Sequence, residues 1–140
     1  MNCEDFMKKA VVFLTRNDTA QAAARLMADS NVGFLPVCEG RKCVGVLTDR
    51  DLALRVVAQE KAASTPVNDI MTRDIVTCSP NDGIEIAADA MIENQISRLA
   101  VTNDDGELVG IISLSDLPTV DAEAAYEAFR GVSAREAHLP

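Results

Sequence analysis

An internal repeat constrains this chain more than any other feature, because it fixes the number and kind of its elements. When the 140-residue sequence is shifted by 64 positions, its first half aligns with its second half, so that Met7 matches Met71. After one extra residue in the polar turn 103–106 the shift becomes 65, and Asp51 falls on Asp116. A repeat tolerates an insertion best in such a turn. The two halves therefore predict two copies of one structural unit.

Each copy predicts the same elements in the same order. A short apolar strand, residues 11–14 or 75–78, precedes Asp18 or Asp82, and each acid is followed three residues later by Gln or Glu, as in a capping box. A helix follows, with apolar residues at the spacing of one helical face. The residues predicted on these faces are Ala20, Ala23, Ala24 and Met27 in the first copy, and Ile84, Ala87, Ala88, Met91 and Ile92 in the second.

A hairpin and a second helix complete each copy. Polar turns with glycine, 39–42 and 103–106, separate two apolar runs, which is a hairpin pattern. Second helices are expected from Asp49 and from about Leu114. The predicted fold class is α/β (α+β), with tandem β-α-β-β-α repeats. Because a unit of about 60 residues buries little surface alone, we expect the copies to pack sheet to sheet about a pseudo-two-fold axis, with a cleft between them.

The expected domain boundaries follow the repeat. Residues 1–62 form the first copy, 63–120 the second, and 121–140 a C-terminal helix and tail. Segment 61–66 is the predicted linker, and 67–71 a short helical segment leading into the second copy. The helix in the tail has an apolar stripe at i, i+3, i+4 and i+7, which suits core or dimer packing.

Charge and composition exclude several classes of partner. A net charge of −9 opposes binding to a nucleic-acid duplex, and one Tyr without any Trp offers little for stacking single-stranded bases. No apolar stretch approaches the roughly 20 residues of a membrane helix, and the N-terminus does not resemble a signal peptide. We therefore expect a cytoplasmic protein without nucleic-acid or membrane partners.

Four cysteines occur, Cys3, Cys38, Cys43 and Cys78, and none forms a CxxC pair. Structural zinc sites usually show close ligand pairs, so no metal site is expected. Cys38 and Cys43 flank the predicted hairpin turn and could approach each other. Two interpretations stay open for them: reduced buried thiols, as is usual in the cytosol, or a hairpin disulfide or redox sensor.

No catalytic constellation is visible in the sequence. The single histidine, His138, lies in the tail, so Ser-His or Cys-His chemistry would lack its base. Neither a P-loop nor a GxGxxG motif occurs. We expect a protein that is not an enzyme and requires no cofactor.

A short motif recurs where the last strand of each copy ends. The segments Gly45–Asp51 and Gly110–Asp116 each run from Gly through apolar residues to Thr or Ser, with Asp three residues later. This spacing is typical of a helix N-cap. A helix N-terminus also favours phosphate, and a carboxylate can accept hydrogen bonds from both hydroxyls of a ribose. A cap and a ligand site are compatible here.

The doubled motif, the repeat length and order, and the strand Leu35-Pro36-Val37 resemble the CBS domain pair, or Bateman module, over residues 3–120. The resemblance implies a sheet-lined cleft that binds adenosine compounds such as AMP, ADP, ATP or S-adenosylmethionine. It also implies disc-like homodimers that pass a ligand signal to a regulated partner protein.

The resemblance further implies roles for individual residues. Asp51 and Asp116 would hold ribose hydroxyls, and Thr48 and Ser113 would contact ribose or phosphate. Arg50 and Arg98 would reach phosphate, unless they are ordinary surface charges. The adenine slot would include Val12, Phe34, Pro36, Ile75 and Val76.

The two copies are not equivalent at these positions. The first copy has Phe34 where the second has Arg98. The second copy has Ala100 where the first has Pro36, and Ser115 where the first has Arg50. We therefore expect two sites of unequal affinity. The leading hypothesis is a sensor of adenine nucleotides. The alternatives are a ligand-free dimerisation scaffold and a binder of S-adenosylmethionine, another adenosyl ligand, a dinucleotide or a metal ion.

Overall fold

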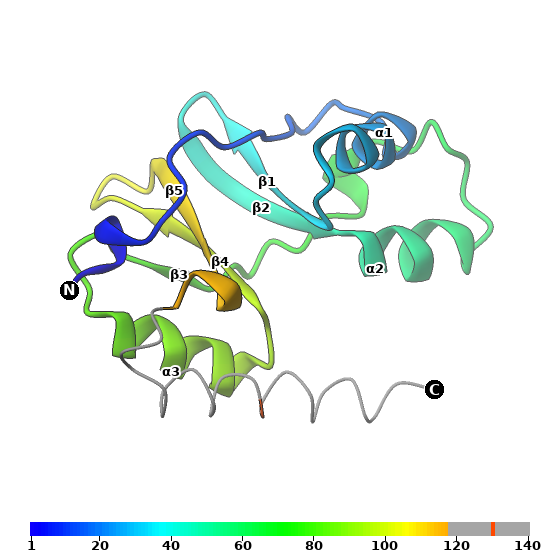
Figure 1. Ribbon diagram of the computed structural model, residues 1–140. Coiled ribbons are helices and arrows are strands. Elements are labelled where there is room, and N and C mark those ends of the chain that lie inside the picture. The colour runs from blue at the N-terminus through cyan, green and yellow to red at the C-terminus, as the bar shows by residue number, and fades with distance from the viewer. Residues whose placement is uncertain (118–129, 131–140) are drawn as a thin grey trace. The chain divides into compact units, whose positions relative to one another are not determined.

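The computed structural model describes residues 1–117 and Arg130 (Figure 1). Its contacts divide the chain into two compact units. The first-repeat unit is Val12–Ile75, and the second-repeat unit combines Met1–Val11 with residues 76–117. Small sheets with flanking helices confirm the predicted mixed α/β class. The helix expected over residues 121–129 lies outside the described residues.

The first-repeat unit is a two-stranded antiparallel hairpin with helices beside it (Figure 1). Only one residue of the strand expected over residues 11–14 pairs with the hairpin, since Leu14 forms a single parallel bridge to Val37. The elements are α1 (Ala20–Ser30), β1 (Phe34–Glu39), β2 (Lys42–Thr48), α2 (Asp49–Leu52), a π-helical continuation (Ala53–Val57) and a 3₁₀ turn (Val67–Asp69).

The second-repeat unit repeats this plan with a three-stranded sheet in the order β3-β4-β5. Its short first strand pairs parallel to β4, and β4 pairs antiparallel to β5. The elements are a 3₁₀ turn (Cys3–Asp5), β3 (Thr77–Cys78), α3 (Ile84–Asn94), β4 (Arg98–Thr102), β5 (Leu108–Ser113) and a 3₁₀ turn (Leu114–Asp116). The second helix expected from Leu114 is described only as this last turn.

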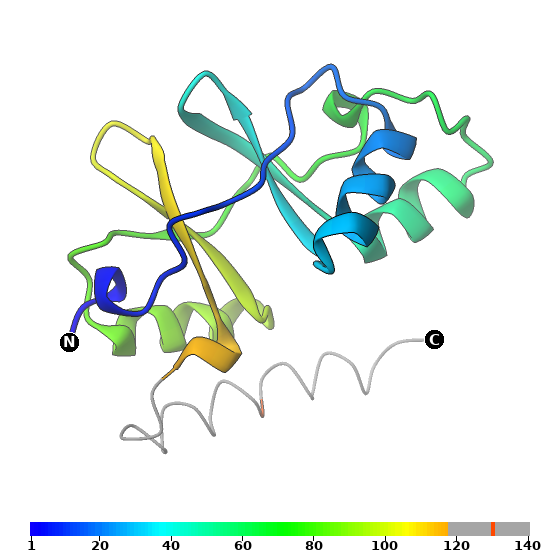
Figure 2. The ribbon, with the colours of Figure 1, turned by 45° about the horizontal axis from the view of Figure 1, so that its top comes forward.

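The segment that precedes each repeat packs on the other repeat's sheet. The N-terminal segment runs along β5, where Lys8 and Ile111 exchange backbone hydrogen bonds of 2.8 and 3.0 Å (Figure 2). In the first-repeat unit, Val46 and Thr72 exchange the equivalent bonds at 3.0 and 2.9 Å. The division into units therefore differs from the repeat boundaries in the sequence.

Both hairpins contain the same one-residue bulge. In β2, Val37 faces Gly45 but Cys38 faces Cys43, so Val44 is the extra residue. In the second hairpin Val101 faces Gly110 and Thr102 faces Leu108, which leaves Val109 as the extra residue. A bulge changes which side chains meet across the strands beyond it.

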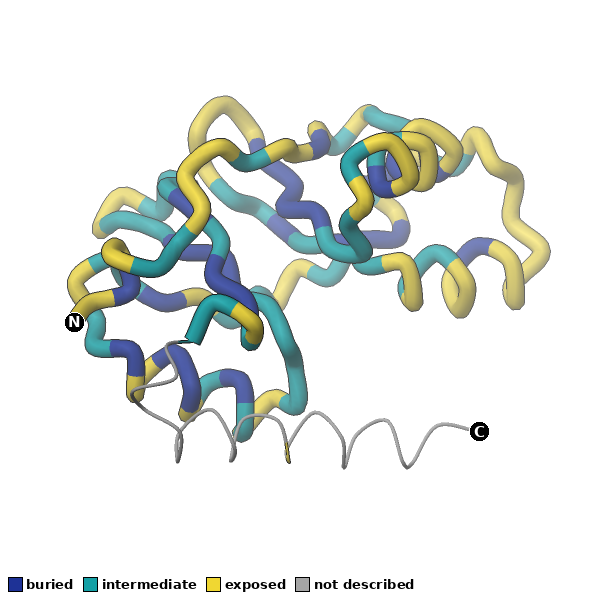
Figure 3. The backbone as a smooth tube through the Cα atoms, viewed as in Figure 1, coloured by how far each residue is buried: buried dark blue, intermediate teal, exposed yellow. Residues whose placement is uncertain are grey.

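Each unit has its own buried core, drawn dark blue along the strands and the inner faces of the helices (Figure 3). The predicted helix faces are largely confirmed, since Ala23 and Ala87 are fully buried. Ala24 is exposed, so its predicted burial is wrong: it lies at the margin of the stripe that buries Ala20, Ala23 and Met27. Ile92 is only half-buried.

The capping boxes predicted at Asp18 and Asp82 are wrong in detail. Each carboxylate instead closes the turn before the helix, accepting a 2.8 Å bond from the backbone N–H of Thr15 or Ser79. Helix α1 is capped one residue later, where Thr19 Oγ1 accepts from the N–H of Ala22 at 3.1 Å. An Asp that folds back on its own turn cannot also cap the helix.

None of the helices in residues 1–117 is long and apolar enough to span a bilayer.

Candidate functional site

Thr48 and Asp51 form a reciprocal capping box where β2 ends and α2 begins. The Thr48 N–H donates to Asp51 Oδ2 at 3.0 Å, and the Asp51 N–H donates to Thr48 Oγ1 at 3.1 Å. The other carboxylate oxygen, Oδ1, lies 3.5 Å from Nη2 of Arg55. Both oxygens of Asp51 are therefore engaged within the unit, and its side chain is only 15% exposed.

Ser113 and Asp116 occupy the equivalent positions after β5. Asp116 Oδ2 accepts from the Ser113 N–H at 2.9 Å and from the Ser113 hydroxyl at 2.8 Å. The Ser115 hydroxyl lies 2.8 Å from Ser113 Oγ, and it is the donor because the Ser113 proton is directed to Asp116. Among residues 1–117, nothing donates to Asp116 Oδ1. Within residues 1–117, this carboxylate therefore has one oxygen without a donor, whereas both oxygens of Asp51 have partners.

The strand register places two more candidate residues beside these boxes. Arg98 is the direct cross-strand partner of Ser113, and Phe34 is the direct partner of Thr48. Directly opposed residues have neighbouring side chains on one face of a hairpin. In the second-repeat unit, an arginine is thus the cross-strand neighbour of the serine whose hydroxyl and N–H bond the aspartate. In the first-repeat unit, an aromatic ring replaces the cation.

The two candidate arginines differ in their surroundings. Arg98 is half-buried, and its Nη1 donates weakly to the carbonyl and hydroxyl oxygens of Ser97, at 3.3 and 3.4 Å. Arg50 is exposed on α2. Arg98 is therefore held near the strand end, whereas Arg50 projects into solvent.

The apolar candidates lie in different environments. Pro36 is fully buried in β1, and its carbonyl accepts a 2.9 Å bond from the Leu14 N–H. Val12 is 42% exposed, while Ile75 and Val76 are half-buried; Ile75 is the last residue of the first-repeat unit and Val76 belongs to the second. The side chain of Pro36 thus packs in the core, and only the other three present apolar surface.

Two residues of this region were missed from sequence. Arg55 lies four residues after Asp51, a spacing at which helical ion pairs form, so helical periodicity could have identified it. In the sequence, Ser115 stands only as the counterpart of Arg50, and no sequence signal points to its hydroxyl as a donor to Ser113. Among the described residues, no three His, Cys, Asp or Glu side chains lie close enough to hold a metal ion.

Comparison with known proteins decides the family. The CBS domain family matches residues 3–58 and 67–123, which is both repeats. The chain belongs to the CBS domain family. Its CBS pair also resembles CBS domain-containing protein YhcV of Bacillus subtilis, with 39% identity over 137 residues, covering 96% of this chain and 97% of that protein.

Two further comparisons show CBS pairs in different settings. The CBS domain pair of protein MJ0100, solved with 5′-methylthioadenosine and S-adenosyl-L-methionine, superposes with a TM-score of 0.77 at 26% identity, covering 88% of this chain and 97% of that one. Inosine-5′-monophosphate dehydrogenase of Korarchaeum cryptofilum is 33% identical over 114 residues, covering 81% of this chain but only 23% of the enzyme. The region similar to this chain is therefore less than a quarter of the dehydrogenase.

Proposed function

We propose that this CBS pair is a non-catalytic regulatory module that binds an adenosine-containing ligand. One arrangement carries this assignment. Arg98 and Ser113 face each other across β4 and β5, and Asp116 follows with a carboxylate oxygen that has no donor among residues 1–117. A carboxylate suits the ribose diol, and a guanidinium suits phosphate. The adenosyl ligands in the MJ0100 complex support this ligand class.

The ligands we expect first are AMP, ADP and ATP, because Arg98 adds a fixed positive charge to a chain whose net charge is −9. Charge-assisted hydrogen bonds to phosphate are shorter and stronger than neutral ones. S-adenosylmethionine carries a cationic sulfonium and no phosphate, so only its carboxylate could pair with this arginine. The nucleotides carry more negative charge and should therefore suit the second-repeat unit better.

We further propose that the two repeats bind unequally. In the first-repeat unit both oxygens of Asp51 already have partners, and Phe34 stands where the other unit has Arg98. A ligand there would share or displace the ion pair with Arg55. The residues Ser113, Asp116 and Arg98 should therefore contribute more affinity for a nucleotide than Thr48, Asp51 and Arg50.

Thermal unfolding with AMP, ADP, ATP, S-adenosylmethionine and 5′-methylthioadenosine tests the assignment. A ligand at 100 times its Kd stabilises the native state by about 2.7 kcal/mol, which raises the melting temperature by several degrees. We expect the shift with AMP to be lost in Asp116→Asn, reduced in Asp51→Asn, and kept in Asp89→Asn, whose exposed carboxylate lies on α3.

The alternative outcomes are distinguishable. No shift with any adenosyl compound at millimolar concentration would contradict the assignment and favour a ligand-free scaffold. A shift with S-adenosylmethionine alone would keep the ligand class but contradict the choice of nucleotides. Turnover of a nucleotide during the same incubation, followed by chromatography, would contradict the non-catalytic role.

A further inference from the structure

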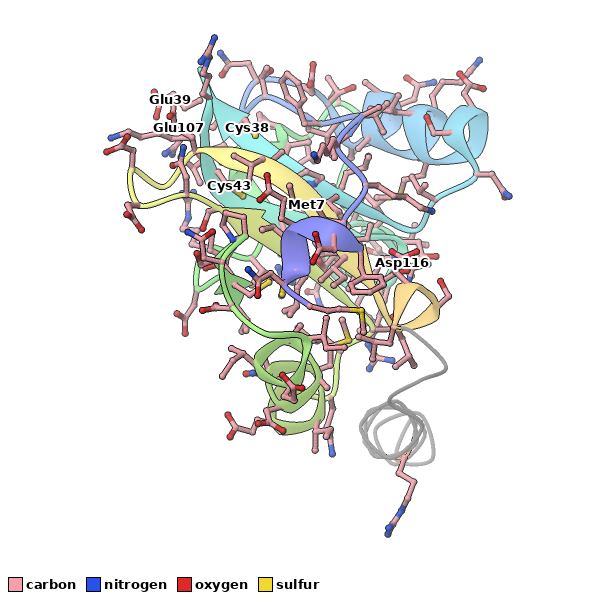
Figure 4. The ribbon with its side chains drawn as sticks, turned by 60° about the vertical axis from the view of Figure 1, so that its left-hand side comes forward. Met7, Cys38, Glu39, Cys43, Glu107 and Asp116 are labelled. Atoms are coloured by element: carbon pink, nitrogen blue, oxygen red, sulfur yellow. The ribbon has the colours of Figure 1, made fainter. Side chains whose placement is uncertain are left out.

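Two cysteines face each other across the β1–β2 hairpin. Cys38 and Cys43 are direct cross-strand partners, and both are free thiols (Figure 4). The bulge at Val44 creates this pairing. With a regular register, Cys38 would instead face Val44.

The fold does not require thiols at these positions. The equivalent pair in the second-repeat unit is Thr102 and Leu108, which follow the same bulge in the same register. The first-repeat unit therefore carries two sulfur atoms where its counterpart packs an ordinary polar and apolar pair.

The backbone geometry suits a disulfide bond. Directly opposed residues of an antiparallel pair have Cα atoms about 4.5–5.5 Å apart. Disulfides span Cα separations of about 4.4–6.8 Å. The hairpin therefore needs no large backbone movement to join Cys38 and Cys43.

The two thiols differ in access and acidity. Cys38 is 3% exposed, whereas Cys43 is half-buried and so retains some contact with solvent. A hydrogen bond from the Cys38 thiol lowers the pKa of Cys43, and the same bond together with burial raises the pKa of Cys38. The thiolate is the reactive form of cysteine. Cys43 is therefore the nucleophile of the pair, and Cys38 is the resolving thiol.

We propose that Cys38 and Cys43 form a dithiol site that reacts with low-molecular-weight disulfides and ends in a disulfide across the hairpin. The Cys43 thiolate attacks one sulfur of the small disulfide, forming a mixed disulfide and expelling one small thiolate. Cys38 then gives up its proton and attacks the Cys43 sulfur, expelling the second small thiolate. The protein loses two electrons and two protons, and the small disulfide becomes two thiols.

Burial of Cys38 does not hinder the second step, because its target sulfur is already its neighbour on the hairpin. Once Cys43 is in a mixed disulfide, the Cys38 thiol no longer donates to a Cys43 thiolate and is no longer repelled by it, so of the causes that raise the pKa of Cys38 only burial remains. The second step is intramolecular and should be faster than the first.

The second cysteine pair provides an internal comparison. Cys3 is 0% and Cys78 is 4% exposed, and their thiols share a hydrogen bond in the second-repeat unit. They occupy the positions of Val67 and Leu14 in the other repeat, where two apolar side chains are buried. Without an accessible sulfur, this pair should stay unmodified while the protein is folded.

Incubation of the reduced, full-length protein with glutathione disulfide tests the site, with peptide mapping by mass spectrometry. We expect an intact mass lowered by two hydrogen atoms and a crosslink between Cys38 and Cys43, reversed by a thiol reductant. Cys38→Ser should stop at a glutathione adduct on Cys43. Cys43→Ser should carry no adduct on the hairpin. Circular dichroism of each variant confirms that it is folded.

Several results would overturn the proposal. One is that Cys43 stays unmodified in the folded wild-type protein and reacts only in denaturant. Another is a crosslink that involves Cys3 or Cys78 in place of the hairpin pair. A folded Cys38→Ser variant without an adduct on Cys43 would also overturn it, independently of whether the disulfide can close.

Discussion

Met71 packs its sulfur over Gly45, so closely that a β-carbon on this glycine would lie 2.6 Å from Met71 Sδ. Met7 and Gly110 repeat the contact in the second-repeat unit, with 2.7 Å between the same two positions. Each methionine belongs to the segment that precedes one repeat, and each glycine lies on the last strand of the other. The glycines therefore allow the exchanged segments to approach the sheets.

Replacing Gly45 with alanine should destabilise the first-repeat unit. The added carbon would meet the Met71 sulfur and the backbone carbonyl of Thr72, at 3.0 Å, and this carbonyl cannot move without weakening the bond that it accepts from the Val46 N–H. Overpacking of this kind costs about 1–3 kcal/mol. The measurement is the free energy of unfolding in urea. Gly83→Ala is the control, since it meets only the tip of Glu85, and an equal loss in both variants would contradict the explanation.

Replacing Thr48 with alanine should remove half of the capping box at α2. The Asp51 N–H would lose its acceptor, and such losses cost about 1 kcal/mol. Thr48→Ser keeps the hydroxyl and should retain most of the stability in the same urea titration. If both variants unfold like the wild type, the box contributes nothing measurable.

Removing residues 1–8 should weaken the second-repeat unit selectively. The Ile111 N–H would lose its acceptor, the Lys8 carbonyl, and buried Cys3 would leave the core. Hydrogen exchange followed by mass spectrometry should show faster exchange in β5. The Val46 amide bonds to Thr72 in the other unit and should stay protected. Equal loss of protection in both units would contradict this division of the chain.

Replacing Arg98 with glutamine should weaken the binding of AMP more than the binding of an uncharged adenosyl ligand. A hydrogen bond to a charged group contributes about 1.5–3 kcal/mol, which corresponds to roughly 10-fold to 100-fold in Kd. Titration calorimetry with AMP and 5′-methylthioadenosine measures both affinities. An equal loss for both ligands would mean that Arg98 supports the fold of the strand end and not the phosphate.

Local patterns were sufficient to predict most elements of the fold. The helical spacing of Ala23 and Ala87 marked the buried faces, and the polar turns marked both hairpins. The sequence could not show on which sheet the segments around Met7 and Met71 pack, because that choice depends on contacts between distant residues. The sequence therefore predicted two copies correctly, but it did not predict which residues make up each compact unit.

The candidate site was predictable only as a set of residue types. The Thr48 and Ser113 motifs predicted two helix starts. The box at Thr48 begins α2, whereas the box at Ser113 encloses a 3₁₀ turn, the last element described there. Which carboxylate oxygens remain open depends on Arg55 and Ser115, whose side chains join the site only after the backbone has folded. The pairing of Cys3 with Cys78 was likewise invisible, because these residues are far apart in the chain.

The exchange of the segments at Met7 and Met71 has a consequence for cutting the chain. A single nick in the exposed stretch 61–64 would yield two fragments, neither of which contains a whole unit. The smaller fragment would hold most of one unit and the N-terminal edge of the other, and the larger would hold the remainder of both. Each unit could therefore form only when both fragments associate. A single repeat expressed by itself would lack the segment that covers its last strand.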